Sequence, residues 1–325
     1  MTTGIALDRR SLLIGSAAIG AAAALPAGKA QATAEQLGVQ RPSVYRFKIG
    51  AFEVTTILDG AIQLPGPHPI FGQNVEQSDV AALAAENFLP ADMFEIPFTV
   101  TVVNTGNEVI LFDTGNGARR RPNAGLLLEM LGSAGLSAEA IDHVVITHFH
   151  GDHIGGLMEN GAPAFPNANL VLGKVEYDHW SNPALLEDEA MKGRAALVQA
   201  NVVPLAEKAR MIEPGEAVVS GVEAVNAFGH TPGHMVYHLE SEGKRLLITA
   251  DTANHYVMSL QKPDWHVRFD MDKDAAVATR KTVFGMIAAD KIPFVGYHMP
   301  APAVGYVEPM AGGFRYVPAS YQLNL

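Results

Sequence analysis

The stretch THFHGDHIGG (residues 147–156) places four ligand-type side chains within six consecutive positions: His148, His150, Asp152 and His153. It follows a nearly continuous apolar run, residues 141–147, that predicts a short strand covered on both faces. Because side chains two positions apart in an extended chain point the same way, the first two imidazoles can face one ion. The aspartate and the third histidine begin a predicted helix, so they can face a second ion beside the first.

Three later apolar runs also end on ligand-type residues: His230, Asp251 and His298. An imidazole or carboxylate at the end of a buried strand is costly to desolvate unless a charged or polar group pairs with it. Ligands of catalytic sites converge at strand ends in this way in open α/β folds. The pattern therefore suggests that these side chains share a cation with the first four.

The chain contains no cysteine, so a metal site must use imidazoles and carboxylates. That donor set suits Zn, Fe, Mn or Co, and five histidines would be unusual for Mg or Ca. Seven ligands are too many for one tetrahedral ion and fit two ions that share a carboxylate and a bridging water. Two adjacent ions lower the pKa of bound water to ~7 and polarise the bond under attack. We expect two divalent ions, with Zn²⁺ as the first candidate.

Length and composition indicate a globular protein that acts on a small molecule. The 325 residues are 48% hydrophobic and 18% charged, which allows a sizeable core. The formal net charge of -11 disfavours nucleic acid, because an acidic surface repels phosphates. A homodimer is one option for the assembly.

The first 32 residues have the layout of an export signal. Arg9 and Arg10 precede an apolar run at residues 12–25, and an A-x-A site ends at Ala32. The paired arginines indicate the twin-arginine route, so we expect a periplasmic or secreted protein with no membrane contact after cleavage. A retained anchor or a frayed helix is the alternative. Residues 33–325 are expected to form one domain.

Strands and helices alternate through both halves, which predicts sheets covered by helices. Strands joined by tight turns at Gly50 and at Asp59-Gly60 are expected at 45–65, and a loop at 65–72. A further hairpin is expected at 98–115, turning at Thr105-Gly106-Asn107. Other strands are expected at 141–148, 168–173, 221–230, 234–241, 244–251 and 292–298, and helices at 78–87, 124–135, 187–201 and 272–290.

The ordered motifs T-H-x-H-x-D-H, G-H-T-P-G-H, a strand-end A-D and a late histidine resemble the metallo-β-lactamase superfamily. The resemblance implies an α/β fold, a four-layer αβ/βα sandwich with the metals at one edge of two sheets. By position it implies that one metal is bound by His148, His150 and His230. It implies that the other is bound by Asp152, His153 and His298, and that Asp251 bridges the two. Asp152 and Asp251 are the candidate catalytic residues.

Within the superfamily, the stretches GAFEVTTILDGAIQLP, AFPNANLV, EYDHW and GGFRYVPASYQ resemble the methyl parathion hydrolase-like group. N-acyl homoserine lactonases are more distant relatives. In the phosphotriesterase, an aromatic cluster forms the leaving-group pocket. Trp180 matches one member of that cluster. The two other positions fall in GARRRPN (117–123) and EAMKGRAA (189–196), which hold no aromatic residue, and arginines 119–121 stand in the first of them. These arginines form either a solvated turn or a cationic lip that favours acidic or carbonyl-rich substrates.

The resemblance implies a hydrolase in which a metal-bridging hydroxide cleaves a lactone or ester. Because aromatic residues of the leaving-group pocket are missing, an organophosphate triester hydrolase is the alternative rather than the first choice. A non-catalytic metal-binding protein on the same fold is an alternative from another functional class. We expect Trp180, Phe71 and Arg119 to line the substrate pocket, together with the loop 65–71 and the stretch near Met258.

Overall fold

A computed structural model describes residues 39–319 and 321–325. The export signal predicted for residues 1–32 lies outside the described residues. The chain divides after Arg41, and Pro42–Leu325 form one compact unit. In the part of the chain that is described, no helix is long and apolar enough to cross a membrane.

The first sheet has seven strands in the order β1-β2-β3-β4-β5-β8-β9. Their bounds are Val44–Ile49, Phe52–Pro65, Met93–Asn104, Val109–Phe112, His143–Ile146, Asn169–Gly173 and Arg210–Ile212. Neighbours from β1 to β4 are antiparallel, and those from β4 to β9 are parallel. The hairpin predicted around Gly106 joins β3 to β4 and is confirmed.

The second sheet also has seven strands, in the order β10-β11-β12-β13-β14-β15-β16. Their bounds are Ala217–Val219, Val222–Asn226, Met235–Ser241, Lys244–Ala250, Phe294–Gly296, Val304–Met310 and Gly313–Pro318. Only β13 and β14 pair in parallel. A small ribbon outside both sheets consists of β6 and β7, Met158–Glu159 and Ala162–Pro163. The last two strands of the second sheet had no counterpart in the sequence-based prediction.

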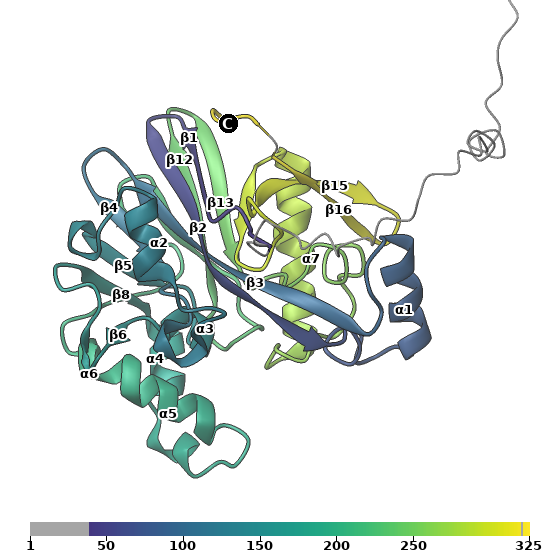
Figure 1. Cartoon of the computed structure of the whole chain (residues 1–325), viewed down its shortest axis with the longest axis horizontal. Coiled ribbons are helices and arrows are strands. Elements are labelled where there is room, and N and C mark those ends of the chain that lie inside the picture. The colour runs from purple at the N-terminus through teal and green to yellow at the C-terminus, as the bar shows by residue number, and fades with distance from the viewer. Residues whose placement is uncertain (1–38, 320) are drawn as a thin grey trace, which may run out of the picture. The chain divides into compact units, whose positions relative to one another are not determined.

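Helices gather in two places. Figure 1 shows α2 to α6 beside β4, β5 and β8, and α7 beside β15 and β16. The bounds of α1 to α7 are Gln77–Glu86, Leu127–Ser133, Gly151–Ile154, Lys174–Trp180, Lys192–Asn201, Val203–Ala206 and Lys273–Asp290. Short 3₁₀ turns lie at Gly117–Arg120, Ala138–Ala140 and Pro183–Leu186. The helix predicted for 187–201 begins only at Lys192, whereas the one predicted for 272–290 is confirmed, with Asp272 as its N-cap.

Strand β5 shows how the layers pack. Val145 joins an apolar cluster that also contains Phe284 of α7, while Val144 and Ile146 join another that contains Leu131 of α2. Because alternate side chains of a strand point to opposite faces, β5 is covered on both sides, as predicted. The layers are therefore helices, sheet, sheet and helix, and the expected four-layer αβ/βα sandwich is confirmed.

The tight turn predicted at Asp59-Gly60 is wrong, because β2 continues through it with only a shift in register at Gly60. Asp59 is fully buried, and its carboxylate accepts hydrogen bonds from the backbone N–H groups of Asn116, Gly125 and Leu127. The Asp-Gly pair thus anchors the loop that follows β4 and the start of α2. A surface turn and a buried anchor favour the same residue types, since both need a carboxylate that accepts backbone N–H groups.

Candidate metal centre

Seven side chains predicted as metal ligands meet where strands of both sheets end. β5 is followed by His148 and His150, α3 holds Asp152 and His153, and β11, β13 and β14 are followed by His230, Asp251 and His298. All of them are buried except Asp152, which is partly exposed. The structure brings together every residue of the predicted ligand set, while the role of each residue as a metal ligand stays a prediction.

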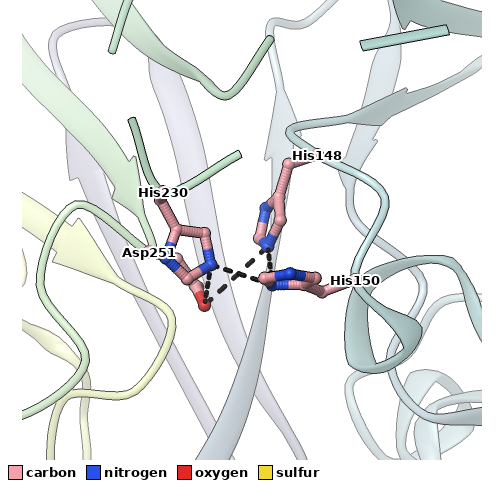
Figure 2. A group of neighbouring side chains, drawn as sticks. All are labelled: His148, His150, His230 and Asp251. Atoms are coloured by element: carbon pink, nitrogen blue, oxygen red, sulfur yellow. Dashed lines mark hydrogen bonds and ion pairs between the residues drawn. The ribbon is translucent and has the colours of Figure 1, made fainter. Parts of the chain in front are cut away.

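Four ligand atoms of the first group point at one another: His148 Nε2, His150 Nδ1, His230 Nε2 and Asp251 Oδ2 (Figure 2). The nitrogen of His150 lies 3.1 Å from that of His148 and 2.9 Å from that of His230. The Asp251 oxygen lies 3.3 Å from the His230 nitrogen and 3.8 Å from the His148 nitrogen. Ligand atoms at 2.0–2.1 Å from a tetrahedral zinc ion are about 3.3–3.4 Å apart, so this spacing fits one ion.

The second group consists of Asp152, His153 and His298, whose ligand atoms lie within 4.8 Å of one another. Asp152 Oδ2 is 3.7 Å from His153 Nε2 and 3.6 Å from His298 Nε2. Asp251 faces this group too, with Oδ1 at 3.2 Å from His153 Nε2 and Oδ2 at 3.1 Å from His298 Nε2. Asp251 is therefore the carboxylate shared by both groups.

Hydrogen bonds to the outer ring nitrogens fix four of the imidazoles. The pairs are His148 Nδ1 with Thr147 Oγ1 at 3.1 Å, His153 Nδ1 with Asp113 Oδ2 at 2.7 Å, His230 Nδ1 with Asp270 Oδ1 at 2.8 Å, and His298 Nδ1 with the Pro97 carbonyl at 2.8 Å. Thr147 Oγ1 donates its own proton to Asp113, so it accepts from His148. In each pair the imidazole donates, which leaves a lone pair on the nitrogen that faces the centre.

Two buried acceptor atoms at the centre have no hydrogen-bond donor in the described part of the chain, which shows whether a cation would fit there. His153 Nε2 and Asp251 Oδ1 are buried and have no hydrogen-bond partner among the described residues, although they lie 3.2 Å apart. Both atoms offer electron pairs, and a buried unpaired acceptor is costly. A divalent ion between such atoms would satisfy them, and the imidazole and carboxylate donor set suits zinc.

The charges of the centre lead to the same conclusion. Burial would raise the pKa of Asp251, but His298 and His153 hold it well below its usual range. Burial lowers the pKa of His148 well below its ordinary value, and the neighbouring imidazole of His153 lowers it further. Burial would also lower the pKa of His230, but Asp251 and Asp270 raise it to about 9. The carboxylates favour a positive charge in the site, but burial prevents all the imidazoles from being protonated together. Divalent cations would supply the positive charge while the imidazoles stay neutral.

Sequence reasoning missed the two carboxylates that orient the ligands. Asp113 follows β4 at a strand end, just as Asp251 follows β13, and this shared position could have identified it. Asp270 hydrogen-bonds His230 and forms a buried ion pair at 2.8 Å with Arg280 of α7. No sequence motif indicated a role for Asp270, because only the tertiary fold brings its loop to the metal centre.

Trp180 was predicted to line the pocket, and the structure contradicts this. Its side chain is fully buried, and Nε1 donates to Glu176 Oε1 at 2.9 Å. The same Glu176 oxygen accepts the Phe149 backbone N–H, and Oε2 accepts the Thr231 hydroxyl and the Gly233 backbone N–H, all at 2.8 Å. Glu176 thus ties the loop of the first two histidines to the loop of His230, and Trp180 supports it.

Phe71 and Met258 are also wrong as pocket residues. Phe71 is fully buried, with its ring edge-on to Phe94 at 5.4 Å and to His255 at 5.5 Å. Met258 is buried in the same apolar cluster. Large apolar side chains of these loops gain more from burial in the core than from lining an open cavity.

A cavity of about 300 Å³ opens beside the metal centre. His150, Asp152, Asp251 and His298 form part of its wall. Its apolar wall contains Ile62, Leu64, Ile96, Phe98, Leu197 and Phe269, and four arginines complete it, Arg119, Arg120, Arg194 and Arg268. Reacting groups and apolar side chains that meet in one cavity are typical of a small-molecule site, and here charged side chains form much of the wall as well.

The arginines at 119–121 divide between the two interpretations of the sequence. Arg119 and Arg120 line the cavity, as a cationic lip would, and Arg119 had been predicted there. Arg121 turns away and pairs through two hydrogen bonds of 2.9 Å with Glu159. Arg194 was missed, although it lies in the stretch 189–196, and Arg268 carried no signal in the sequence.

Comparisons with known proteins agree with this geometry. A family model described as the metallo-β-lactamase superfamily matches residues 97–286. The N-acyl homoserine lactonase AiiA of Bacillus thuringiensis subsp. kurstaki is 27% identical over 184 residues, which are 50% of this chain and 67% of that protein. The N-acyl homoserine lactonase of Bacillus cereus is 23% identical over 228 residues, 64% of this chain and 84% of that protein.

Two solved structures share the fold. AidC, a dizinc quorum-quenching lactonase in complex with a product, is 27% identical with a TM-score of 0.79, covering 86% of this chain and 98% of its own. The hydrolase AbOPH is 23% identical with a TM-score of 0.81, covering 87% of this chain and 100% of its own. The resemblance to the methyl parathion hydrolase-like group stays a prediction. With the sandwich, the ordered ligands and the family match in agreement, the chain belongs to the metallo-β-lactamase superfamily.

Proposed function

We propose that this metal-dependent hydrolase holds two divalent ions, zinc first among the candidates, and opens the ring of a lactone or cleaves a simple ester. The observation that carries the proposal is Asp251, which faces both ligand groups at the wall of the cavity. The relatives named as N-acyl homoserine lactonases and the dizinc lactonase AidC support it.

The first ion would be held by His148, His150 and His230, the second by Asp152, His153 and His298, with Asp251 shared. When bound, such ions supply a nucleophile from water at neutral pH and polarise the carbonyl under attack. The chain's own contribution is a rigid frame, because each fixed imidazole presents one lone pair at a set position. Tyr297 adds to that frame, since its ring lies 3.9 Å from that of His153 and its hydroxyl donates to the Asp152 carbonyl.

Ring opening breaks the acyl C–O bond, adds the hydroxyl of water to the carbonyl carbon and delivers the remaining proton to the leaving oxygen. Asp152 is the group we assign to this transfer, because its partly exposed carboxylate stands at the wall of the cavity. A carboxylate there can take the proton from the attacking water and return it to the leaving alkoxide. The product is a hydroxy acid.

The test is a substrate panel on the zinc-loaded protein: N-acyl homoserine lactones, aryl esters and organophosphate triesters. We expect zinc-dependent turnover of a lactone or ester with a higher kcat/KM than that of any triester. A triester preferred by about tenfold would select the organophosphate alternative, since such a ratio is a difference in transition-state binding. Bound zinc without turnover of any substrate would select the non-catalytic metal-binding protein. A homodimer stays a prediction that sedimentation would test.

A further inference from the structure

Four guanidinium groups line the cavity without an anionic partner. Among the described residues, none of the four forms a hydrogen bond or ion pair with a carboxylate. They come from separate segments: Arg119 and Arg120 follow β4, Arg194 lies in α5, and Arg268 precedes α7. Three parts of the chain therefore deliver positive charge to one cavity of about 300 Å³.

Several arginines elsewhere in the described chain pair with carboxylates, and Arg46 and Arg210 donate to backbone carbonyls. Arg121 pairs with Glu159, Arg245 with Asp290, and Arg280 with Asp270. The whole chain carries a formal net charge of -11, so acidic partners are abundant. Arg119 and Arg268 are exposed, and Arg120 and Arg194 are partly buried. Four guanidiniums around one cavity, without a carboxylate partner among the described residues, nevertheless depart from the mixture of both signs that is usual on a solvated surface.

Aromatic rings hold two of the guanidiniums by their faces. Arg120 lies over Phe98 and Arg268 over Phe269, each with its guanidinium carbon 5.4 Å from the ring centroid. Stacking of this kind fixes the plane of the group and leaves its N–H edge available to a ligand. Burial lowers the pKa of Arg119, and so does the charge of Arg120, while Asp152 opposes both. The cations thus repel one another, and an anion between them would relieve that repulsion.

The only carboxylates at the cavity wall among the described residues are Asp152 and Asp251, and both belong to the candidate metal centre. With these engaged as ligands, the four arginines are left to bind substrate. We propose that the natural substrate carries an anionic oxygen group, a carboxylate or a phosphate, which these arginines bind while the scissile carbonyl lies at the metal centre. This inference rests on the proposed hydrolase function and names its substrate class.

The cavity volume limits the substrate to a compact molecule, since 300 Å³ is at the small end of ligand sites. The apolar wall contacts the short chain between the carbonyl and the anion, and the arginines provide planar, bidentate recognition of carboxylate or phosphate oxygens. The neutral acyl chains of N-acyl homoserine lactones would leave the four guanidiniums without partners.

The experiment compares matched lactones on the zinc-loaded protein. One is N-hexanoyl homoserine lactone, and two others have the same chain length but end in a carboxylate or a phosphate. We expect an anionic lactone to have about tenfold or higher kcat/KM than the neutral one, because charge-assisted bonds to arginine are strong. The advantage should shrink in high salt, which screens partly exposed charges. The better of the two anionic compounds identifies the anion.

Arg194→Gln and Arg268→Gln should remove most of that advantage, chiefly by raising KM for the anionic lactone more than KM for the neutral one. Arg315→Gln is the control, because the exposed side chain of Arg315 in β16 lies outside the cavity and pairs with Glu308 of β15. The control should preserve the preference for the anionic lactone.

Calorimetric binding of the matching lactam analogues, which resist hydrolysis, separates the two levels of the proposal. Arginine-dependent binding of an anionic lactam without turnover of any lactone would overturn the proposed hydrolysis and support the anion site. Equal turnover of neutral and anionic lactones, or a preference that survives in both arginine variants, would overturn the anion site while leaving lactone hydrolysis in place. Weaker binding of anionic than of neutral lactams would also overturn the anion site.

Discussion

Glu176 offers the sharpest test of how the metal ligands are positioned. Its two oxygens accept four donors, and three of these are N–H groups, from Phe149, Trp180 and Gly233, that cannot act as acceptors. Burial raises the pKa of this carboxyl, while the four donors lower it. In Glu176→Gln, the amide NH₂ must face at least one of these N–H groups in either orientation, so a donor meets a donor.

The expected cost follows from that geometry. Losing a hydrogen bond to a charged acceptor costs about 1.5–3 kcal/mol, and a buried unsatisfied N–H adds about 1–3 kcal/mol. We therefore expect Glu176→Gln to lower the free energy of unfolding by about 3–5 kcal/mol. Because Phe149 stands between His148 and His150, and Thr231 follows His230, zinc affinity should fall about 10- to 100-fold.

Urea unfolding and zinc competition with a chromophoric chelator measure the two effects. Thr231→Val removes only the hydroxyl donor, so it should weaken zinc binding less. Asp178→Asn is the matched control on the same helix, since Asp178 is exposed and pairs only with Lys174 among the described residues, and it should change stability by less than about 0.5 kcal/mol. Glu176→Gln with zinc affinity and stability like those of Asp178→Asn would refute the role of Glu176 as the tie between the two ligand loops.

Three further predictions concern the centre, the pH range and the N-terminus. Asp251→Ala should lose more lactone hydrolysis than a variant of any single other ligand, by about tenfold, because only Asp251 faces both groups; kcat/KM across the seven variants decides this. Burial lowers the pKa of His255 from 6.5 to about 4. The folded protein therefore disfavours protonated His255, so the free energy of unfolding is undiminished above pH 6.5 and falls by up to about 3 kcal/mol as the pH drops toward 4. Urea unfolding of zinc-loaded wild type and His255→Asn across that range should show a shallower decline in the variant, and parallel curves would rule out His255 as the cause. Export with cleavage near Ala32 is expected from residues 1–32, and N-terminal sequencing of the protein from the cell envelope would contradict it by finding Met1.

The strand ends and their ligands were predictable because both are local properties of the chain. An apolar run that stops at an imidazole or carboxylate shows at once where a strand ends and what it presents, as at His148 and Asp251. The long helix α7 was equally clear from its N-cap, Asp272, and its length. Local signals of this kind predicted sheets covered by helices and the members of the candidate metal centre, whereas the four-layer arrangement came from the resemblance to the superfamily.

What the sequence could not predict depends on partners that are distant along the chain. Trp180 was assigned to the pocket by resemblance, but its indole N–H donates to the buried Glu176, whose other donors include Thr231 and Gly233, more than fifty residues away. Asp59 satisfies backbone groups more than fifty residues away, so its turn-like neighbour Gly60 was misleading. Arg268 reaches the cavity only because the chain from β13 to α7 passes the metal centre, and no short-range pattern records that path.

The central claim is that this chain hydrolyses lactones with two metal ions that share Asp251 as a ligand. Its most direct test is lactonase activity titrated against zinc, measured per chain on metal-free protein. Activity should rise with added zinc and level off at about two equivalents, because the seven ligands form two groups joined by one carboxylate. A plateau at one equivalent, or no activity at any ratio, would contradict the claim.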